Sequence, residues 1–152
     1  MSTLQEFKED LALFVEGGLL AIKQGDELGA KKLFNAAAIL DPEGGQHQMG
    51  YGLIALHKME LPEAKNNFEE LIKLDKTNWR AQSFLAFAHM LSVFEEEASP
   101  ENQQASLEKA ASLATEVLEK SDSDQTRQVA QSIIDWQLSL QAEGAKKRGP
   151  AG

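Results

Sequence analysis

A 34-residue period is the feature that most limits what this chain can fold into. Between residues 15 and 76, a shift of 34 positions superimposes glycines, alanines and one aromatic residue on their own kind. The matches are Gly18 with Gly52, Ala21 with Ala55, Ala30 with Ala64, Phe34 with Phe68, Leu40 with Leu74 and Asp41 with Asp75. This period is typical of paired-helix repeats, in which one unit buries its apolar face only against a neighbour. The sequence therefore predicts a stack of helix pairs.

Composition narrows the class of protein. The 152 residues fit one domain, and 42% hydrophobic with only 7% aromatic residues suits helices packed through small side chains. The formal net charge of -9 argues against a nucleic-acid partner, because phosphate binding needs concentrated Lys and Arg. The chain has no cysteine. It shows neither a signal-peptide pattern nor an apolar run of about 18 residues, so we expect an intracellular protein without membrane insertion.

Capping residues, glycines and prolines predict the helix boundaries. Thr3 and Glu6 form a capping-box pattern, and Gly17-Gly18 inside the first helix indicates close approach of a paired helix. The acidic, polar stretch 95–104 is expected to be an insertion. The expected helices are 4–23, 27–40, 46–58, 62–74, one from about 79, 105–120 and 125–142.

The repeat resembles the tetratricopeptide repeat. Aromatic, glycine, alanine, aromatic, alanine and proline positions of that family are matched by Phe14, Gly18, Ala30, Phe34, Ala37 and Pro42, and the second copy keeps Gly52, Ala64 and Phe68. The resemblance implies an all-α fold: a right-handed superhelical stack of about three helix pairs with an N-terminal extension and a C-terminal capping helix. The expected organisation is one domain over 1–143, with repeats at about 11–44, 45–78 and 79–122, a capping helix at 124–142 and a flexible basic tail at 144–152.

No catalytic or metal-binding constellation has a recognisable spacing in the sequence. His47, His57 and His89 lie outside metal-ligand patterns, so we expect packing or surface roles for them, no enzyme activity and no cofactor.

Two short motifs have both a functional and a structural interpretation. Gly44-Gly45-Gln46 resembles the motif with which release factors hydrolyse peptidyl-tRNA, but its acidic flanks favour a turn in which glycine accepts positive φ. Glu95-Glu96-Glu97 is either an acidic docking site for a basic partner or a solvated loop entrance.

The geometry of the tetratricopeptide family implies which side chains face the concave groove. They are the fifth, ninth and twelfth positions of each repeat, and eight of the nine are apolar. The predicted groove residues are Val15, Leu19, Ile22, Met49, Leu53, Leu56, Ser83, Phe87 and Met90. Repeats that clamp the acidic C-termini of heat-shock proteins use Lys, Arg and Asn instead, so an apolar or amphipathic segment is the expected ligand. Alternatively, the chain's own terminal helices cover this face.

Residues 49–59 and 130–136 resemble the tetratricopeptide chaperones of bacterial type III secretion systems. The resemblance implies a non-catalytic chaperone of the bacterial cytoplasm, which binds an amphipathic helix of a secreted needle or translocator subunit and prevents its premature assembly. A small co-chaperone is a further expected partner. The alternative is an adaptor or assembly scaffold that bridges proteins or forms a homodimer through the same face.

Overall fold

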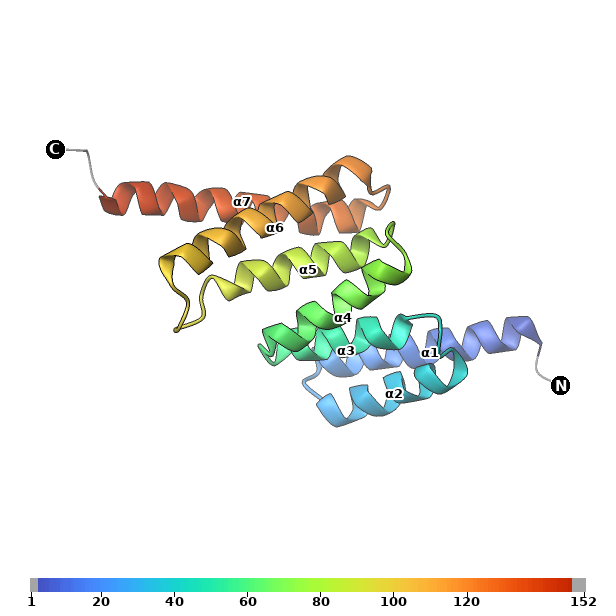
Figure 1. Cartoon of the computed structure of the whole chain (residues 1–152). Coiled ribbons are helices and arrows are strands. Elements are labelled where there is room, and N and C mark those ends of the chain that lie inside the picture. The colour runs from blue at the N-terminus through green and yellow to red at the C-terminus, as the bar shows by residue number, and fades with distance from the viewer. Residues whose placement is uncertain (1–2, 149–152) are drawn as a thin grey trace. The chain divides into compact units, whose positions relative to one another are not determined.

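The computed structural model describes residues 3–148, and the elements within this range are all helices (Figure 1). The helices are α1 (Leu4–Lys23), α2 (Glu27–Leu40), α3 (Gln46–His57), α4 (Leu61–Leu74), α5 (Trp79–Ser92), α6 (Pro100–Lys120) and α7 (Asp124–Arg148). The all-α prediction is confirmed for this part of the chain. The first five helices begin within one residue of their predicted starts.

The helices form two compact units. Unit 1 contains α1–α4 and extends to Lys76, whereas unit 2 begins at Thr77 and contains α5–α7. The border falls two residues before the predicted end of the second repeat at 78. A single domain with a continuous superhelical stack stays a prediction.

Phenylalanine rings packed on glycines form the centre of unit 1. Phe34 of α2 is fully buried between Gly18 of α1 and Gly50 of α3. A Cβ atom added to Gly18 would stand 2.7 Å from Phe34 Cζ, and one added to Gly50 would stand 2.3 Å from Phe34 Cδ1. Phe68 of α4 packs in the same way on Gly52, where an added Cβ would stand 2.6 Å from the ring. Glycine therefore allows the close helix approach that the sequence predicts at Gly18.

The turn that joins the two helices of a pair also repeats. After α1, the amides of Gly25 and of the next residue donate to carbonyl oxygens three and five residues back, at 3.0 and 2.8 Å. After α3, the amides of Met59 and of the next residue make the same bonds at 3.1 and 2.8 Å. Both residues are left-handed, with φ of 76° at Gly25 and 61° at Met59. The two copies thus share a Schellman-type helix end although only one of them has glycine.

The prediction for the start of α6 was wrong. The helix begins at Pro100 rather than near residue 105, because Ser99 caps it: Ser99 Oγ accepts a hydrogen bond from the Asn102 amide at 3.1 Å. Proline suits the first turn, where its missing amide proton costs nothing. The segment between α5 and α6 is therefore 93–99, rather than an insertion at 95–104 as predicted.

The core of unit 2 is built differently from that of unit 1. Phe34 and Ala30 are the eighth and fourth residues of α2. The eighth and fourth residues of α6 are Leu107 and Gln103. Gln103 Nε2 donates to the oxygen of Val93 at 3.1 Å and so ties α6 to the end of α5. Side chains of α5, α6 and α7, four of them alanines, form the buried core: Ala86, Met90, Ala110, Ala114, Val117, Ala130 and Ile133.

The C-terminal helix is longer than predicted. We expected it to end at residue 142 with a flexible tail from 144, but α7 continues to Arg148. Ala145 and the basic residues that follow it are good helix formers, and positive charge near a helix C-terminus interacts favourably with the helix dipole. Residues 149–152 of the predicted tail lie outside the described residues.

We expect Gly18→Ala to lower the free energy of unfolding by about 1–3 kcal/mol, because its methyl group would overlap the buried Phe34 ring. Gly17→Ala is the matched control in the same helix, since its Cβ would meet only the flexible end of Leu33, at 3.1 Å. Both substitutions gain the same helix propensity, up to about 1 kcal/mol. Urea unfolding measures the difference, and equal stability of the two variants would contradict the role of Phe34.

The repeated turn predicts opposite effects at its two copies. Gly25→Ala should destabilise the protein by about 1 kcal/mol, because alanine disfavours positive φ, and no atom lies within 4 Å of the new Cβ to add a clash. Met59→Gly should stabilise it by about 0.5–1 kcal/mol, because glycine relieves the left-handed strain. Thermal unfolding of both variants tests the pair. Destabilisation by Met59→Gly would show that methionine makes compensating contacts.

Candidate partner-binding site

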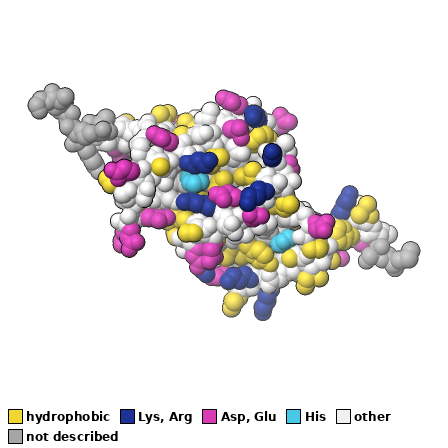
Figure 2. Space-filling model, in the orientation of Figure 1, with side chains coloured by type: hydrophobic (Ala, Val, Ile, Leu, Met, Phe, Trp, Pro, Cys, Tyr) yellow, Lys and Arg dark blue, Asp and Glu magenta, His cyan; other side chains and the backbone are white. Residues whose placement is uncertain are grey.

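Three predicted groove residues form an apolar stripe on α1. Val15, Leu19 and Ile22 follow at spacings of four and three residues, which places them on one face of the helix. All three are partly buried and pack against the core of unit 1 together with Tyr51 of α3. That core cluster consists of Ala21, Ala30, Phe34 and Ile54. We call Val15, Leu19, Ile22 and Ile54 the α1–α3 surface, since Ile54 is buried in the core but lines a pocket together with Ile22. On the face shown in Figure 2, hydrophobic side chains gather over unit 1.

The predicted groove residues of α3 lie on a different face of that helix from Tyr51 and Ile54. Met49 and Leu53 are half-buried and Leu56 is buried, whereas α3 contributes Tyr51 and Ile54 to the cluster beside the α1 stripe. The packing of Phe34 on Gly50 fixes the rotation of α3. A groove lined by Met49, Leu53 and Leu56 stays a prediction.

The predicted groove residues of α5 lie in the interior of unit 2. Ser83 is 1% exposed and Met90 is fully buried, so neither offers an open surface. Phe87 packs on Trp136 of α7, with ring centroids 6.4 Å apart. The chain's own C-terminal helix therefore covers this face of α5, which is the alternative that the sequence left open.

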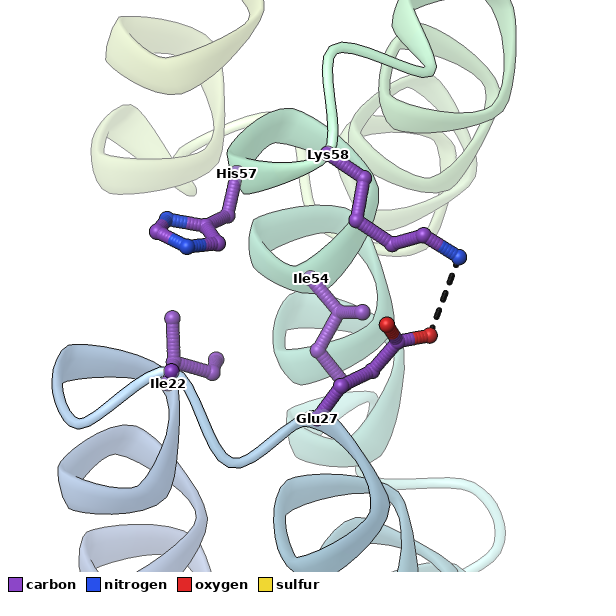
Figure 3. Close-up of a pocket in the computed structure, with 6 residues that line it drawn as sticks. Ile22, Glu27, Ile54, His57 and Lys58 are labelled. Carbon is purple, nitrogen blue, oxygen red and sulfur yellow. Dashed lines mark hydrogen bonds and ion pairs between the residues drawn. The ribbon is translucent and has the colours of Figure 1, made fainter.

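A pocket of about 250 Å³ lies at one end of the α1–α3 surface (Figure 3). Figure 3 shows Ile22 and His57 facing each other on one side, Ile54 between the helices, and the ion pair of Glu27 with Lys58 on the other side. Gly25 completes the lining. Ile22 and Ile54 form the apolar part of the lining, whereas His57, Glu27 and Lys58 are its polar part. This arrangement is typical of a pocket that receives an apolar anchor side chain from a partner.

Four charges form the polar wall and its surroundings. Glu27 Oε1 lies 2.9 Å from Lys58 Nζ and 3.0 Å from Lys31 Nζ, and Lys58 Nζ lies 3.0 Å from Glu60 Oε1. The hydrogen bond from Lys58 lowers the pKa of Glu27, and the same bond raises the pKa of Lys58. Two lysines and two glutamates balance each other, so this wall offers no net charge to a ligand. Burial of apolar surface at Ile22 and Ile54 is therefore the source of binding free energy in this pocket.

Tyr51 connects the α1–α3 surface to α2. Its hydroxyl donates a hydrogen bond to Asn35 Oδ1. Its ring meets Phe34 and His47 edge to face, with centroids 6.5 and 5.9 Å apart. Burial raises the pKa of Tyr51 above its ordinary value of 10.0. Contacts from α2 and α3 therefore fix the orientation of this side chain.

Several chemical roles find no support in the part of the chain that the structure describes. Over residues 3–148, no group of three or more His, Asp or Glu side chains is placed to hold a metal ion. None of the helices in that range has the length and apolar character needed to cross a bilayer. Gly45 of the release-factor-like motif is the N-cap of α3 with φ of 78°, as expected for a turn residue.

The search for relatives gave no match: neither protein-family models nor curated proteins include a sequence similar to this chain. Its function must therefore be inferred from the repeat and from the geometry of the site.

Sequence reasoning missed most of the pocket. Ile22 was predicted as a binding residue, but Glu27, Ile54 and Lys58 were not, and His57 was assigned only a packing or surface role. A signal was available, because the first helices of successive repeats lie side by side with the same direction, which brings their C-terminal ends together. Ile22 and His57 stand near those two ends.

Tyr51 provides a pH-dependent test of this packing. A raised pKa means that the folded state holds the phenol proton more tightly, so this contribution to stability is complete below about pH 10 and is lost as pH rises through the folded pKa. Tyr51 is the only tyrosine, so ultraviolet absorbance of the phenolate reports its titration directly. Tyr51→Phe should remove this fall in stability, and a normal titration of the folded protein would contradict burial.

Proposed function

We propose that this chain is a non-catalytic chaperone that holds an amphipathic helix of a secreted protein on the α1–α3 surface. The observation that carries the proposal is the stripe of Val15, Leu19 and Ile22, which ends in a pocket with one apolar wall. A partner helix with apolar residues at helical spacing matches such a stripe, and one of its side chains enters the pocket.

The energetics require the stripe and the pocket together. Full burial of one apolar side chain contributes about 1.5–3 kcal/mol before ordering costs are subtracted. A micromolar complex needs about 8 kcal/mol of net binding free energy. One anchor in the pocket is therefore too weak. Three or four such contacts together give about 4.5–12 kcal/mol before ordering costs, so the stripe and the pocket must both contribute.

The resemblance to type III secretion chaperones supports the identity of the partner. Residues 49–59 and 130–136 carry that resemblance, and it suggests a needle or translocator subunit held in the bacterial cytoplasm, with a small co-chaperone as an additional partner. The α1–α3 surface would then mask a segment that otherwise assembles with its own copies.

A homodimeric adaptor is the second candidate function. Unit 1 carries large hydrophobic side chains on its surface, and their exposed fractions favour self-association. The exposed fractions are 66% for Leu13, 55% for Leu20, 74% for Leu28 and 83% for Ile39. In that case a second copy of the chain covers unit 1 and occupies the α1–α3 surface.

Ile22→Glu tests the chaperone proposal, with Leu20→Glu as the matched control on the same helix. Ile22 lines the pocket, whereas Leu20 is 55% exposed and lies outside the stripe. We expect affinity purification from the native cell to recover a secreted subunit with the wild type and with Leu20→Glu, and at least about tenfold less with Ile22→Glu. The amphipathic helix of that subunit, made as a peptide, should then bind in calorimetry with the same order of affinities.

Two further measurements separate the outcomes. Circular dichroism must show unchanged helicity for Ile22→Glu, and Ile22→Trp, which fills the pocket while staying apolar, should also prevent capture. Equal capture by Ile22→Glu would rule out the α1–α3 surface. A stable dimer in light scattering that Ile22→Glu dissociates would support the adaptor instead.

A further inference from the structure

Unit 2 carries an exposed aromatic side chain that its own packing does not need to bury. Phe94 follows α5 and is 52% exposed, yet its ring stacks on Trp136 of α7 with centroids 5.3 Å apart and an angle of 14° between the planes. Phe87 also packs on Trp136, with ring centroids 6.4 Å apart and an angle of 47° between the planes. Trp136 thus packs against the Phe94 ring, and about half of the Phe94 side chain stays exposed.

The surroundings of this ring are strongly acidic. Glu95, Glu96 and Glu97 follow Phe94 directly and are exposed. From residue 81 to residue 108 the sequence has five glutamates and no lysine or arginine, and from 128 to 144 it has two acidic residues and no basic one. Cations are therefore absent from the chain segments that come together at the stack, namely the end of α5, the start of α6 and the middle of α7. The segment between α5 and α6 is yellow in Figure 1.

An aromatic face and surrounding carboxylates attract the same kind of ligand. The face of an aromatic ring carries partial negative charge and binds guanidinium or ammonium groups, most strongly when the ring is fixed. Carboxylates around it raise the local concentration of cations and steer basic segments toward the surface. Val93 and Leu91 beside Phe94 are half-buried, so the surface also offers apolar contact.

We propose that Phe94, stacked on Trp136 and flanked by Glu95–Glu97, is a docking site for a basic segment of a partner protein. The segment places an arginine over the open face of Phe94 and an apolar side chain beside it, while further arginines pair with the glutamates. This site belongs to unit 2 and is separate from the α1–α3 surface of unit 1. Its ligand is defined by positive charge, whereas the α1–α3 surface selects for apolar side chains.

Fluorescence of Trp136 tests the site directly. Trp79→Phe leaves Trp136 as the only tryptophan of the chain, and the probe is a short synthetic peptide of alternating arginine and leucine. We expect the emission of Trp136 to change saturably with peptide concentration. Added salt should weaken the binding, since the Debye length falls to roughly 3 Å at 1 M. In the same background, Phe94→Ala and Phe94→Leu should each weaken binding about tenfold. The leucine variant keeps the apolar contact, so its loss of affinity measures the contribution of the aromatic face.

Charge-matched variants distinguish a site from general attraction to an acidic protein. Replacing Glu95, Glu96 and Glu97 by glutamine should weaken binding about tenfold. The control replaces Glu9, Glu16 and Glu69, which are exposed in unit 1, and should change it less than about twofold. A peptide with glutamine in place of arginine should not bind.

The proposal is overturned if Phe94→Ala binds the peptide as tightly as the parent, or if both triple variants weaken binding equally. It is also overturned if light scattering shows that the chain forms a stable dimer to which the peptide does not bind. Because Ile22→Glu should leave peptide binding unchanged, failure of the chaperone proposal would leave this result intact.

Discussion

Unit 1 depends on one phenyl ring that is held between two glycines. Phe34 can be fully buried because neither Gly18 nor Gly50 has a side chain in its path. Three helices therefore meet at a single residue of α2, and that residue sets how α1 and α3 face each other. Val15, Leu19 and Ile22 of α1 and Tyr51 of α3 all pack against the core cluster to which this ring belongs. The packing of Phe34 in the core thus positions the apolar surface on which the proposed function rests.

Unit 2 solves the same packing problem with different residues. Its core uses alanines with Met90, Val117 and Ile133 where unit 1 uses phenylalanine and glycine, and α7 covers the face of α5 that the repeat geometry assigns to a groove. A helix that closes the end of a repeat array needs such an apolar inner face. The surface that remains on unit 2 includes the exposed ring of Phe94 beside Glu95–Glu97.

Most local signals were read correctly from the sequence, whereas most tertiary contacts, apart from the close approach at Gly18, were not. The bounds of α1 and α2 follow from Thr3, Gly25 and Asp26, whose capping bonds involve only neighbouring residues. The start of α6 was also local, but the acidic run before it hid the signal of Ser99 and Pro100. The rotation of α3 and the cover of α5 by α7 depend on contacts between distant segments. Hydrophobic periodicity predicts which face of a helix is apolar, but it does not predict which segment packs against that face.

Met59 lies one 34-residue period after Gly25 and has the same left-handed backbone conformation. The two helix ends close through the same pair of main-chain hydrogen bonds, although methionine carries a long side chain and glycine carries none. The hydrogen bonds of the turn, rather than the residue at its left-handed position, therefore define where the chain reverses. A comparison of main-chain paths recognises this correspondence at a position where a comparison of amino acids does not.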